Sequence, residues 1–184
     1  MFNLYDVDKN YVDFIQTAET TKRGFTRVPN MDYAGREQKF LCGIVLQING
    51  MNYYVGATSY AIPQTENILI EFKDDKKNPI KGSLRFNYMF PIPTECVKVR
   101  IIDNEQNPIR RTFLAKQLHF FNNNVELIQR KALSTYKKVI GGYSPFLVKN
   151  SCDFSLIESA CLEYCKIHSF KLHPAADNLE RISL

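Results

Sequence analysis

The first half of the chain contains short apolar runs, rich in β-branched and aromatic residues and separated by turn-forming residues, which predict β-strands. A helix interrupts this pattern early, because Asp8 is a favourable N-cap and apolar residues then recur at helical spacing from residue 9 to residue 20. The stretches without periodicity are expected to form loops or turns, namely 21–38, 60–67 and 73–81. The predicted strands are 2–7, the two arms of a hairpin within 39–59, 68–72, 83–89 and 97–102.

The hairpin is the most strongly indicated of these elements. Its arms, KFLCGIVLQI and MNYYVGATS, are rich in β-branched and aromatic residues. They flank Asn49-Gly50, a dipeptide whose residues tolerate the positive φ angles of a type I′ turn. A two-residue turn places Ile48 opposite Met51 and thereby fixes every pair that follows.

Regular pairing from this turn predicts which residues meet at the open end of the hairpin. Phe40 is expected opposite Ser59, and Lys39 opposite Tyr60. Lys39 then shares a face with its diagonal neighbour Thr58, while Ser59 points the other way at the same end. An ammonium group and two hydroxyls at one strand end could hold a phosphate. In a simpler interpretation the lysine is only solvated and the hydroxyls bond loop backbone.

The second half of the chain changes to helical spacing. Pro108 favours the start of one helix, and residues 122–124 interrupt it. An apolar stripe at steps of three and four then predicts a second helix that ends at Gly141-Gly142. A last helix is predicted from Asp153 or Ser155 to about residue 169.

Length and composition suit one α+β domain over residues 1–170, followed by a tail over 171–184. The chain is 45% hydrophobic and 23% charged, which are ordinary values for a globular protein. Its apolar runs are shorter than the roughly 18 residues of a membrane span, and its N-terminus lacks the features of a signal peptide, so a cytoplasmic location is expected. The five scattered cysteines predict buried thiols rather than disulfides or a metal site.

The positive charge is concentrated in one segment. The whole chain carries a formal net charge of +5, whereas residues 107–140 carry seven bases and a single acid, Glu126. A localised basic segment suits a polyanion such as RNA, although solvated helix faces are also often basic. The bases are Arg110, Arg111, Lys116, Arg130, Lys131, Lys137 and Lys138.

Four stretches of the sequence together resemble a known family. They are GIVLQING…YYVGATS in the hairpin, VPN at 28–30, KQLHF at 116–120 and SCDFSLIE at 151–158. The pattern is similar to the ToxN/AbiQ/CptN family, the toxins of type III toxin–antitoxin and phage abortive-infection systems. The resemblance extends over about residues 1–168. It implies a metal-independent endoribonuclease with a compact, strongly curved antiparallel sheet surrounded by helices, similar to MazF/CcdB-like toxins.

The resemblance also implies a set of functional residues. The family has a lysine two places after the serine of the hairpin, but Ala61 stands there in this chain. Lys39 could supply the missing charge alone, or Arg36, Lys73 or Arg85 could reach the site. Two tyrosines belong to the set. The alternative for Tyr11 is packing in the core, and the alternative for Tyr33 is an incidental position in a loop. The implied catalytic residues are Tyr11, Tyr33, Lys39, Thr58 and Ser59.

Metal-free RNA cleavage uses the ribose 2′-hydroxyl as nucleophile and gives a 2′,3′-cyclic phosphate and a 5′-hydroxyl end, with no cofactor. Hydroxyls and lysines can stabilise the phosphoryl charge, and a histidine pair is not expected. Implied partners are substrate transcripts and an antitoxin RNA of short repeats, in a closed RNA–protein oligomer. The alternatives are a non-catalytic RNA-binding module and a toxin neutralised by a protein. Expected RNA contacts are Arg36, Lys73, Arg85, Arg110, Arg111, Lys116, Arg130 and Lys137.

Overall fold

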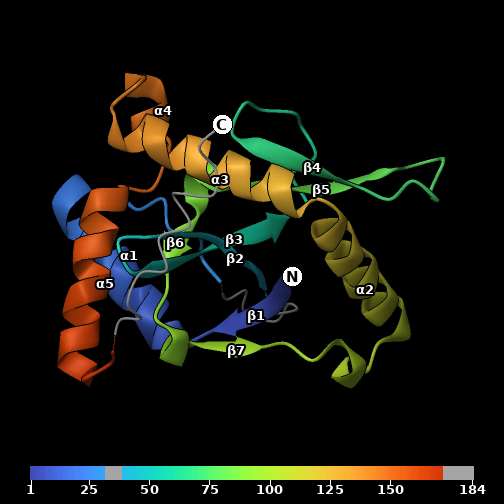
Figure 1. Cartoon of the computed structure of the whole chain (residues 1–184), viewed down its shortest axis with the longest axis horizontal. Helices are drawn as coiled ribbons and strands as arrows, with labels where there is room; N and C mark the ends of the chain where they lie inside the picture. Colours follow the sequence, from blue (N-terminus) through green and yellow to red (C-terminus); the bar gives the residue numbers. More distant parts are fainter. Residues whose placement is uncertain (32–38, 172–184) are drawn as a thin grey trace.

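The computed structural model describes residues 1–31 and 39–171, and the expected site residues Tyr33 and Arg36 lie outside these ranges. Within the described residues an antiparallel sheet is joined by helices (Figure 1). The strands are β1 (Asn3–Val7), β2 (Leu41–Ile48), β3 (Met51–Thr58), β4 (Asn67–Glu71), β5 (Ile80–Arg85), β6 (Phe90–Pro91) and β7 (Val97–Val99). The α-helices are α1 (Lys9–Arg23), α2 (Pro108–Asn123), α3 (Val125–Ile140), α4 (Pro145–Lys149) and α5 (Phe154–His168).

The sheet has the strand order β4-β5-β3-β2-β1-β7, with β6 paired to β3 off this path. Helices α1 and α5, which are far apart in the sequence, lie side by side (Figure 1) and share a T-shaped contact between the rings of Tyr11 and Tyr164 at 5.1 Å. Helix α3 crosses the sheet and packs Tyr136 against Tyr53 of β3. The expected α+β architecture is therefore confirmed. The sheet is open, and the strong curvature expected from the resemblance is not confirmed.

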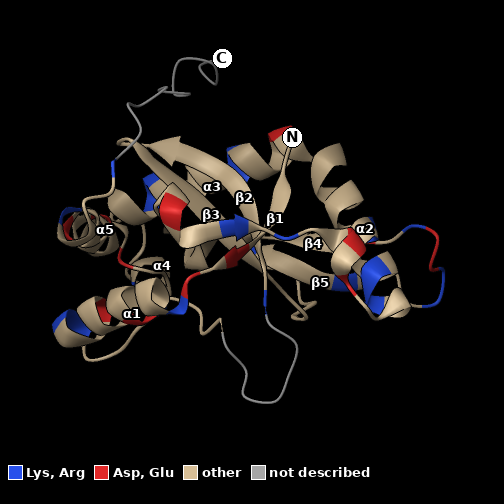
Figure 2. Cartoon of the chain, turned by 90° about the horizontal axis from the view of Figure 1, so that it is seen from below, with Lys and Arg blue, Asp and Glu red and all other residues tan. Residues whose placement is uncertain are grey.

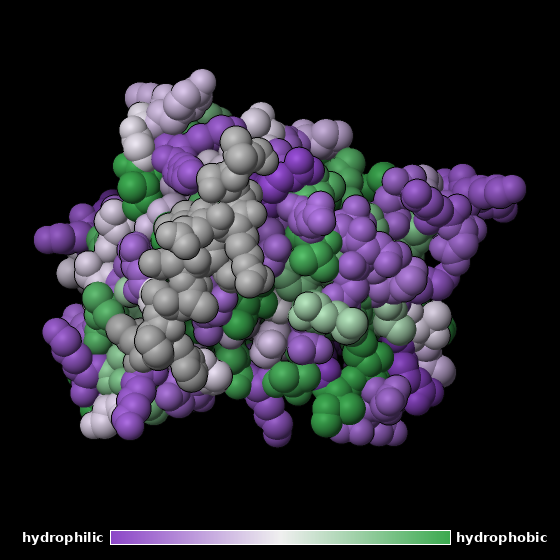
Figure 3. Space-filling model, in the orientation of Figure 1, coloured by the Kyte–Doolittle hydropathy of each residue, from purple (hydrophilic) through white to green (hydrophobic). Residues whose placement is uncertain are grey.

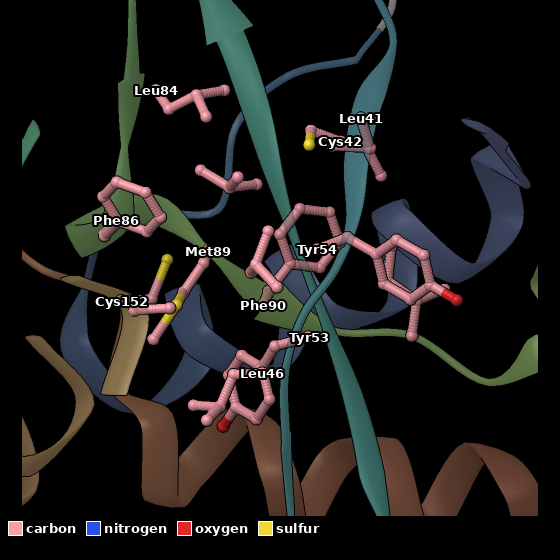
Figure 4. Close-up of a cluster of buried hydrophobic side chains, with 14 of the residues drawn as sticks. Leu41, Cys42, Leu46, Tyr53, Tyr54, Leu84, Phe86, Met89, Phe90 and Cys152 are labelled. Carbon is pink, nitrogen blue, oxygen red and sulfur yellow. The ribbon is translucent and has the colours of Figure 1, made fainter. Parts of the chain in front are cut away.

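Buried aromatic side chains form much of the core between β2, β3 and the segment after β5 (Figure 4). Tyr53, Phe86 and Phe90 are all fully buried. Burial of such a side chain contributes about 1.5–3 kcal/mol. Tyr54 packs directly on Gly43 of β2, where an added Cβ would lie 2.1 Å from the tyrosine ring. Only glycine fits this position without displacing the ring.

The hairpin has the predicted turn but not the predicted register at its open end. Ile48 pairs with Met51 as expected, and Asn49 and Gly50 have φ angles of +52° and +72°. Between Gly43 and Leu46, however, β2 carries two extra residues, so that Leu41 pairs with Gly56. The expected pairs Phe40–Ser59 and Lys39–Tyr60 are therefore wrong.

A shift of two residues leaves every side chain on its predicted face. The observed register, continued outward from the Leu41–Gly56 pair, brings Lys39 level with Thr58. The lysine thus meets the threonine directly instead of diagonally. The irregularity changes the partners at the open end and preserves the orientation of the two side chains.

The helices of the second half begin and end close to the predicted residues. Helix α2 begins at Pro108, α3 is followed by Gly141 and Gly142, and Gly142 has a φ of +63°. The N-cap of α5 is Asp153, whose Oδ1 accepts a hydrogen bond from Leu156 N at 3.1 Å; the alternative start at Ser155 is wrong. The short helix α4 had no counterpart among the predicted elements.

Two predicted strands are shorter in the structure. The strand expected over 83–89 ends at Arg85, where the chain enters a 3-10 turn over Phe86–Tyr88 before β6. The strand expected over 97–102 ends at Val99 and is followed by a second 3-10 turn. After the first strand, Phe86 and Met89 are fully buried and pack into the core instead of continuing the ladder, whereas after the second strand Ile101 is exposed.

The surface mixes polar and apolar side chains. Basic and acidic residues both occur on the helices and on the turn between β4 and β5, where they are lysines and aspartates (Figure 2), and that turn projects from the body as a hydrophilic segment (Figure 3). The five cysteines are buried and unpaired with one another, as predicted, and burial raises the pKa of Cys161 to about 12. None of the described helices has both the length and the apolar character needed to cross a membrane.

Candidate functional site

A hollow of about 290 Å³ opens at the end of the β2–β3 hairpin. It lies between the end of β3, the end of β5 with its 3-10 turn, and the loop that follows α1. Three of its lining residues are cations, and none of its described lining residues is acidic. A cluster of positive charge without carboxylates suits a phosphate group. Its polar lining residues are Thr26, Arg27, Lys39, Thr58, Arg85 and Tyr88.

Thr58 is held in the hollow by the strand beside it. It pairs with Ser83 of β5, whose buried hydroxyl donates a 2.7 Å hydrogen bond to Tyr60 O. The neighbouring Gly82 has a φ of +143°, and an added Cβ there would lie 2.0 Å from Thr58 O. The Thr58 Oγ1 accepts a 3.3 Å hydrogen bond from Tyr60 N, so its proton remains available to donate to a ligand.

Lys39 lines the same hollow from the other arm of the hairpin. Its ammonium group donates a 2.6 Å hydrogen bond to the carbonyl oxygen of Asn30 in the loop after α1. The structure therefore brings Lys39 and Thr58 together in one accessible site. The sequence-based pairing of an ammonium with a hydroxyl at this strand end is realised, although through a different register.

Ser59 and Tyr11 do not line this hollow. Ser59 is exposed at the same strand end, one residue beyond Thr58. Tyr11 is completely buried between α1 and α5, and its hydroxyl donates a 2.5 Å hydrogen bond to Pro91 O. Burial raises the pKa of the Tyr11 hydroxyl well above its ordinary value. The core-packing alternative therefore describes Tyr11 better than a place beside a substrate.

Arg85 provides a further cation in the lining of the hollow, in a chain that has Ala61 where the family pattern has a lysine. Its guanidinium lies between two tyrosine rings, 4.8 Å from the centre of Tyr60 and 4.3 Å from that of Tyr88. Its Nη2 donates to Tyr88 Oη at 3.2 Å and to Gln64 Oε1 at 3.3 Å. Of the three substitutes considered from the sequence, Arg85 lines this hollow and Lys73 does not.

The wall formed by the loop after α1 depends on Glu19, which the sequence analysis did not single out. Its carboxylate is fully buried at the end of α1. One oxygen accepts hydrogen bonds from Thr26 Oγ1 at 2.7 Å and from Arg27 N at 2.6 Å. The other accepts from Arg23 Nη1 at 2.6 Å and from Asp153 N at 2.8 Å.

These hydrogen bonds determine the ionisation of Glu19. Burial raises the pKa of the carboxyl, but the donors from Thr26, Asp153, Arg27 and Arg23 outweigh burial and lower the pKa below its ordinary value. A charged Glu19 thus holds the loop that contributes Arg27 to the hollow. The sequence offered only one signal for this role, namely that Glu19 lies near the end of a predicted helix and shortly before Arg23 and Arg27.

The other described residues predicted to bind RNA lie outside this hollow. Lys73, Arg111 and Lys116 share a second, wider hollow of about 980 Å³ between the end of β4 and α2, where Lys116 also pairs with Asp74. Arg110 pairs with Glu105 at 2.9 Å. The remaining two, Arg130 and Lys137, are exposed on α3.

Comparison with known proteins assigns the family. A family model described as the toxin ToxN of type III toxin–antitoxin systems matches residues 3–162. The chain belongs to the ToxN toxin family. The endoribonuclease ToxN of Bacillus thuringiensis subsp. kurstaki is 27% identical over 169 residues, covering 87% of this chain and 82% of the relative. The endoribonuclease AbiQ of Lactococcus lactis subsp. lactis is 26% identical over 140 residues, covering 70% of this chain and 75% of the relative.

Solved structures of type III toxin–antitoxin toxins share the fold. A type III toxin studied for its selective inhibition by a non-coding RNA pseudoknot gives a TM-score of 0.76 at 24% identity, covering 89% of this chain and 97% of that one. The structure of AbiQ, described as a lactococcal anti-phage endoribonuclease, gives a TM-score of 0.76 at 21% identity. It covers 90% of this chain and 99% of the AbiQ chain. The family expected from the sequence is confirmed. Among the described residues of this ToxN-family chain, no group of three or more His, Cys, Asp and Glu side chains is placed to hold a metal ion.

Proposed function

We propose that this member of the ToxN family is an endoribonuclease toxin that cleaves RNA at the hollow beside Thr58. The observation that carries the proposal is the meeting of Thr58 with Lys39 and Arg85 in a site whose described lining is cationic and free of acids. Two relatives over most of the chain are named endoribonucleases. The substrate would be single-stranded RNA from the host or from an infecting phage.

The reaction requires an in-line attack within the RNA itself. The 2′-oxygen of one ribose forms a bond to the adjacent phosphorus, and the bond from phosphorus to the 5′-oxygen of the next nucleotide breaks. A proton leaves the 2′-hydroxyl, and a proton reaches the departing 5′-oxygen. The products carry a 2′,3′-cyclic phosphate and a 5′-hydroxyl end.

The residues of the hollow match the charge that develops in this reaction. Thr58 would donate its hydroxyl proton in a hydrogen bond to a non-bridging phosphoryl oxygen, while Lys39 and Arg85 stabilise the negative charge from two sides. Arg85 would take the role of the lysine that the family pattern has where this chain has Ala61. Ser59 and Tyr33 remain proposed catalytic residues, as candidates for the proton transfers at the two oxygens.

The proposed regulator is an antitoxin RNA built from short repeats. Relatives with the same fold are described as inhibited by an RNA pseudoknot or regulated by a processed non-coding RNA. In this chain the exposed lysines and arginines outside the hollow would attract the phosphate backbone of the antitoxin RNA. A closed RNA–protein oligomer is the proposed assembly. The proposed RNA-binding residues are Arg36, Lys73, Arg85, Arg110, Arg111, Lys116, Arg130 and Lys137.

Incubation of the purified protein with end-labelled single-stranded RNA tests the proposal. The reaction is run with EDTA, and product ends are identified by mass spectrometry. We expect cyclic-phosphate and 5′-hydroxyl ends in the presence of the chelator. Thr58→Val removes the hydroxyl but keeps the β-branched shape, and should lower the rate roughly 10²- to 10³-fold. Thr17→Val, on the exposed surface of α1, is the matched control and should cleave like the wild type.

Two results would contradict the proposal. RNA that is bound but remains intact would favour the alternative of a non-catalytic RNA-binding module. A Thr58→Val variant that retains full activity would show that the catalytic centre lies elsewhere. Ser59→Ala provides a second check, since loss of cleavage and toxicity with an unchanged melting temperature would support a role for this exposed hydroxyl.

A further inference from the structure

One wall of the hollow carries an aromatic ring that the cleavage chemistry does not use. Tyr88 lines the hollow, and Pro29, Met31 and Ala57 contribute apolar side chains to the same lining. The cations and Thr58 can bind a phosphate, but the cleavage chemistry gives no role to Tyr88 and the apolar side chains of the lining. A site that takes RNA must also accommodate the bases attached to that phosphate's sugars.

The position of Tyr88 is fixed from two directions. It ends the 3-10 turn Phe86–Tyr88, in which Phe86 is fully buried and Asn87 Nδ2 donates a 2.7 Å hydrogen bond to Asn150 O. The guanidinium of Arg85 lies 4.3 Å from the centre of the Tyr88 ring and donates to its hydroxyl. The ring therefore has little freedom to reorient.

Arg85 is itself held between Tyr88 and a second ring. Tyr60 lies on its other side, at 4.8 Å, and Gln64 binds both the arginine and the Tyr60 hydroxyl. Such a stack orders the arginine and the two rings together, since cation–π contacts favour one relative orientation. Among the described residues, the Nε of Arg85 is buried and has no hydrogen-bond partner. The stack, not a hydrogen bond, therefore positions this part of the side chain.

We propose that Tyr88 is a stacking platform for one unpaired nucleobase adjacent to the phosphate that occupies the cationic side of the hollow. This rests on the proposed function, because it assumes that the hollow receives RNA. Aromatic side chains are a common means of holding the splayed bases of single-stranded RNA. A hollow of about 290 Å³ that combines three cations with a fixed tyrosine suits one nucleotide, with its phosphate at the cations and its base on the ring.

The proposal is tested by binding, so that it does not depend on cleavage. The probe is a set of short 2′-O-methyl oligonucleotides, which lack the attacking hydroxyl, each with an abasic residue at one position. For the wild type we expect one position at which the missing base weakens binding about 5- to 150-fold, the range for one base stacked on an aromatic ring. Tyr88→Leu should abolish this penalty at that position and leave the other positions unchanged.

Two further variants complete the experiment. Tyr88→Phe keeps the ring but loses the hydroxyl that binds Arg85, and it should retain the abasic penalty. Tyr143→Leu removes a tyrosine that is 78% exposed and outside the lining of the hollow, and it should behave like the wild type. An abasic penalty that is equal in the wild type and in Tyr88→Leu would overturn the platform, as would its complete loss in Tyr88→Phe.

The outcome for the platform is separate from the outcome for the proposed function. Failure of the wild type to cleave ordinary RNA would refute the endoribonuclease proposal, while a position-specific abasic penalty that Tyr88→Leu abolishes would still establish the platform. Cleavage that requires Thr58 but shows no base-dependent contribution from Tyr88 would refute the platform alone. Absence of both cleavage and any abasic penalty would refute both.

Discussion

The backbone N–H of Arg27 donates a 2.6 Å hydrogen bond to the buried carboxylate of Glu19. This contact joins the last turns of α1 to the loop that forms one wall of the cationic hollow. Further along the same loop, Asn30 O accepts the hydrogen bond from the Lys39 ammonium. A single buried acid therefore binds the loop that carries Arg27 and that contacts Lys39, two of the three cations of the hollow.

Replacement of Glu19 by glutamine should affect both stability and cleavage. The amide cannot accept every hydrogen bond of the carboxylate and leaves Arg23 without its ionic partner. Breaking a buried pair of this kind costs roughly 3–5 kcal/mol of the free energy of unfolding, measured by chemical denaturation. Glu163→Gln, on the exposed face of α5, should leave that free energy within about 0.5 kcal/mol of the wild type. Equal effects of the two substitutions would contradict the role of Glu19.

The lowered pKa of Glu19 predicts that the folded protein loses stability in acid. Hydrogen bonds lower the pKa of Glu19 in the folded protein below its ordinary value of 4.5. Since the unfolded chain binds the proton more readily, the stabilisation is complete above pH 4.5 and is lost as the pH falls through the lower, folded pKa. Melting temperatures recorded between pH 7 and pH 3 should fall more steeply in the wild type than in Glu19→Gln. Parallel curves would exclude Glu19 as the cause.

A methyl group at Gly82 should displace Thr58. The added Cβ would lie 2.0 Å from Thr58 O, and the φ of +143° is strained for any residue except glycine. We expect Gly82→Ala to lower both the melting temperature and the cleavage rate. For comparison, Gly56→Ala places its Cβ in ordinary contact, 3.9 Å from Leu41, and should melt close to the wild type. A crystal structure of Gly82→Ala with Thr58 unmoved would disprove this explanation.

If Arg85 supplies the positive charge of the lysine in the family pattern, a lysine restored at position 61 should compensate for the loss of Arg85. Arg85→Met should reduce the cleavage rate, and adding Ala61→Lys to that variant should restore part of it, because the second change returns an ammonium to the family position. Thr17→Lys in the same background adds a remote charge and should restore nothing. Equal recovery from both lysines would indicate general attraction of RNA rather than a defined site. The measurement is kcat and KM on one RNA oligonucleotide.

Local signals in the sequence were sufficient for most of the elements. Asn49-Gly50, Pro108 and Gly142 each determine backbone geometry over a few residues, and the elements that they border were predicted closely. The strand expected over 83–89 failed because its apolar residues pack onto the core from a 3-10 turn, and an apolar run by itself does not distinguish the two. Helix α4 is too short to give a periodic signal.

The site was predictable only in part, because its residues meet through long-range packing. The hairpin indicated that Lys39 would approach Thr58, but the two extra residues of β2 changed the pairing. Arg85 reaches the hollow from another strand, with no signal near Ala61 in the sequence. The role of Glu19 depends on contacts with the loop after α1, which the sequence does not predict.

The irregular segment between Gly43 and Leu46 separates the hairpin into two halves that are fixed independently. The turn at Asn49-Gly50 sets the inner half, whereas β1 sets the outer half by pairing with β2 from Leu41 to Gly43. A change in length at this irregular segment would therefore leave the pairing of the outer half, and with it the approach of Lys39 to Thr58, under the control of β1. The length of this segment and the geometry of the open end are thus separate properties of the hairpin.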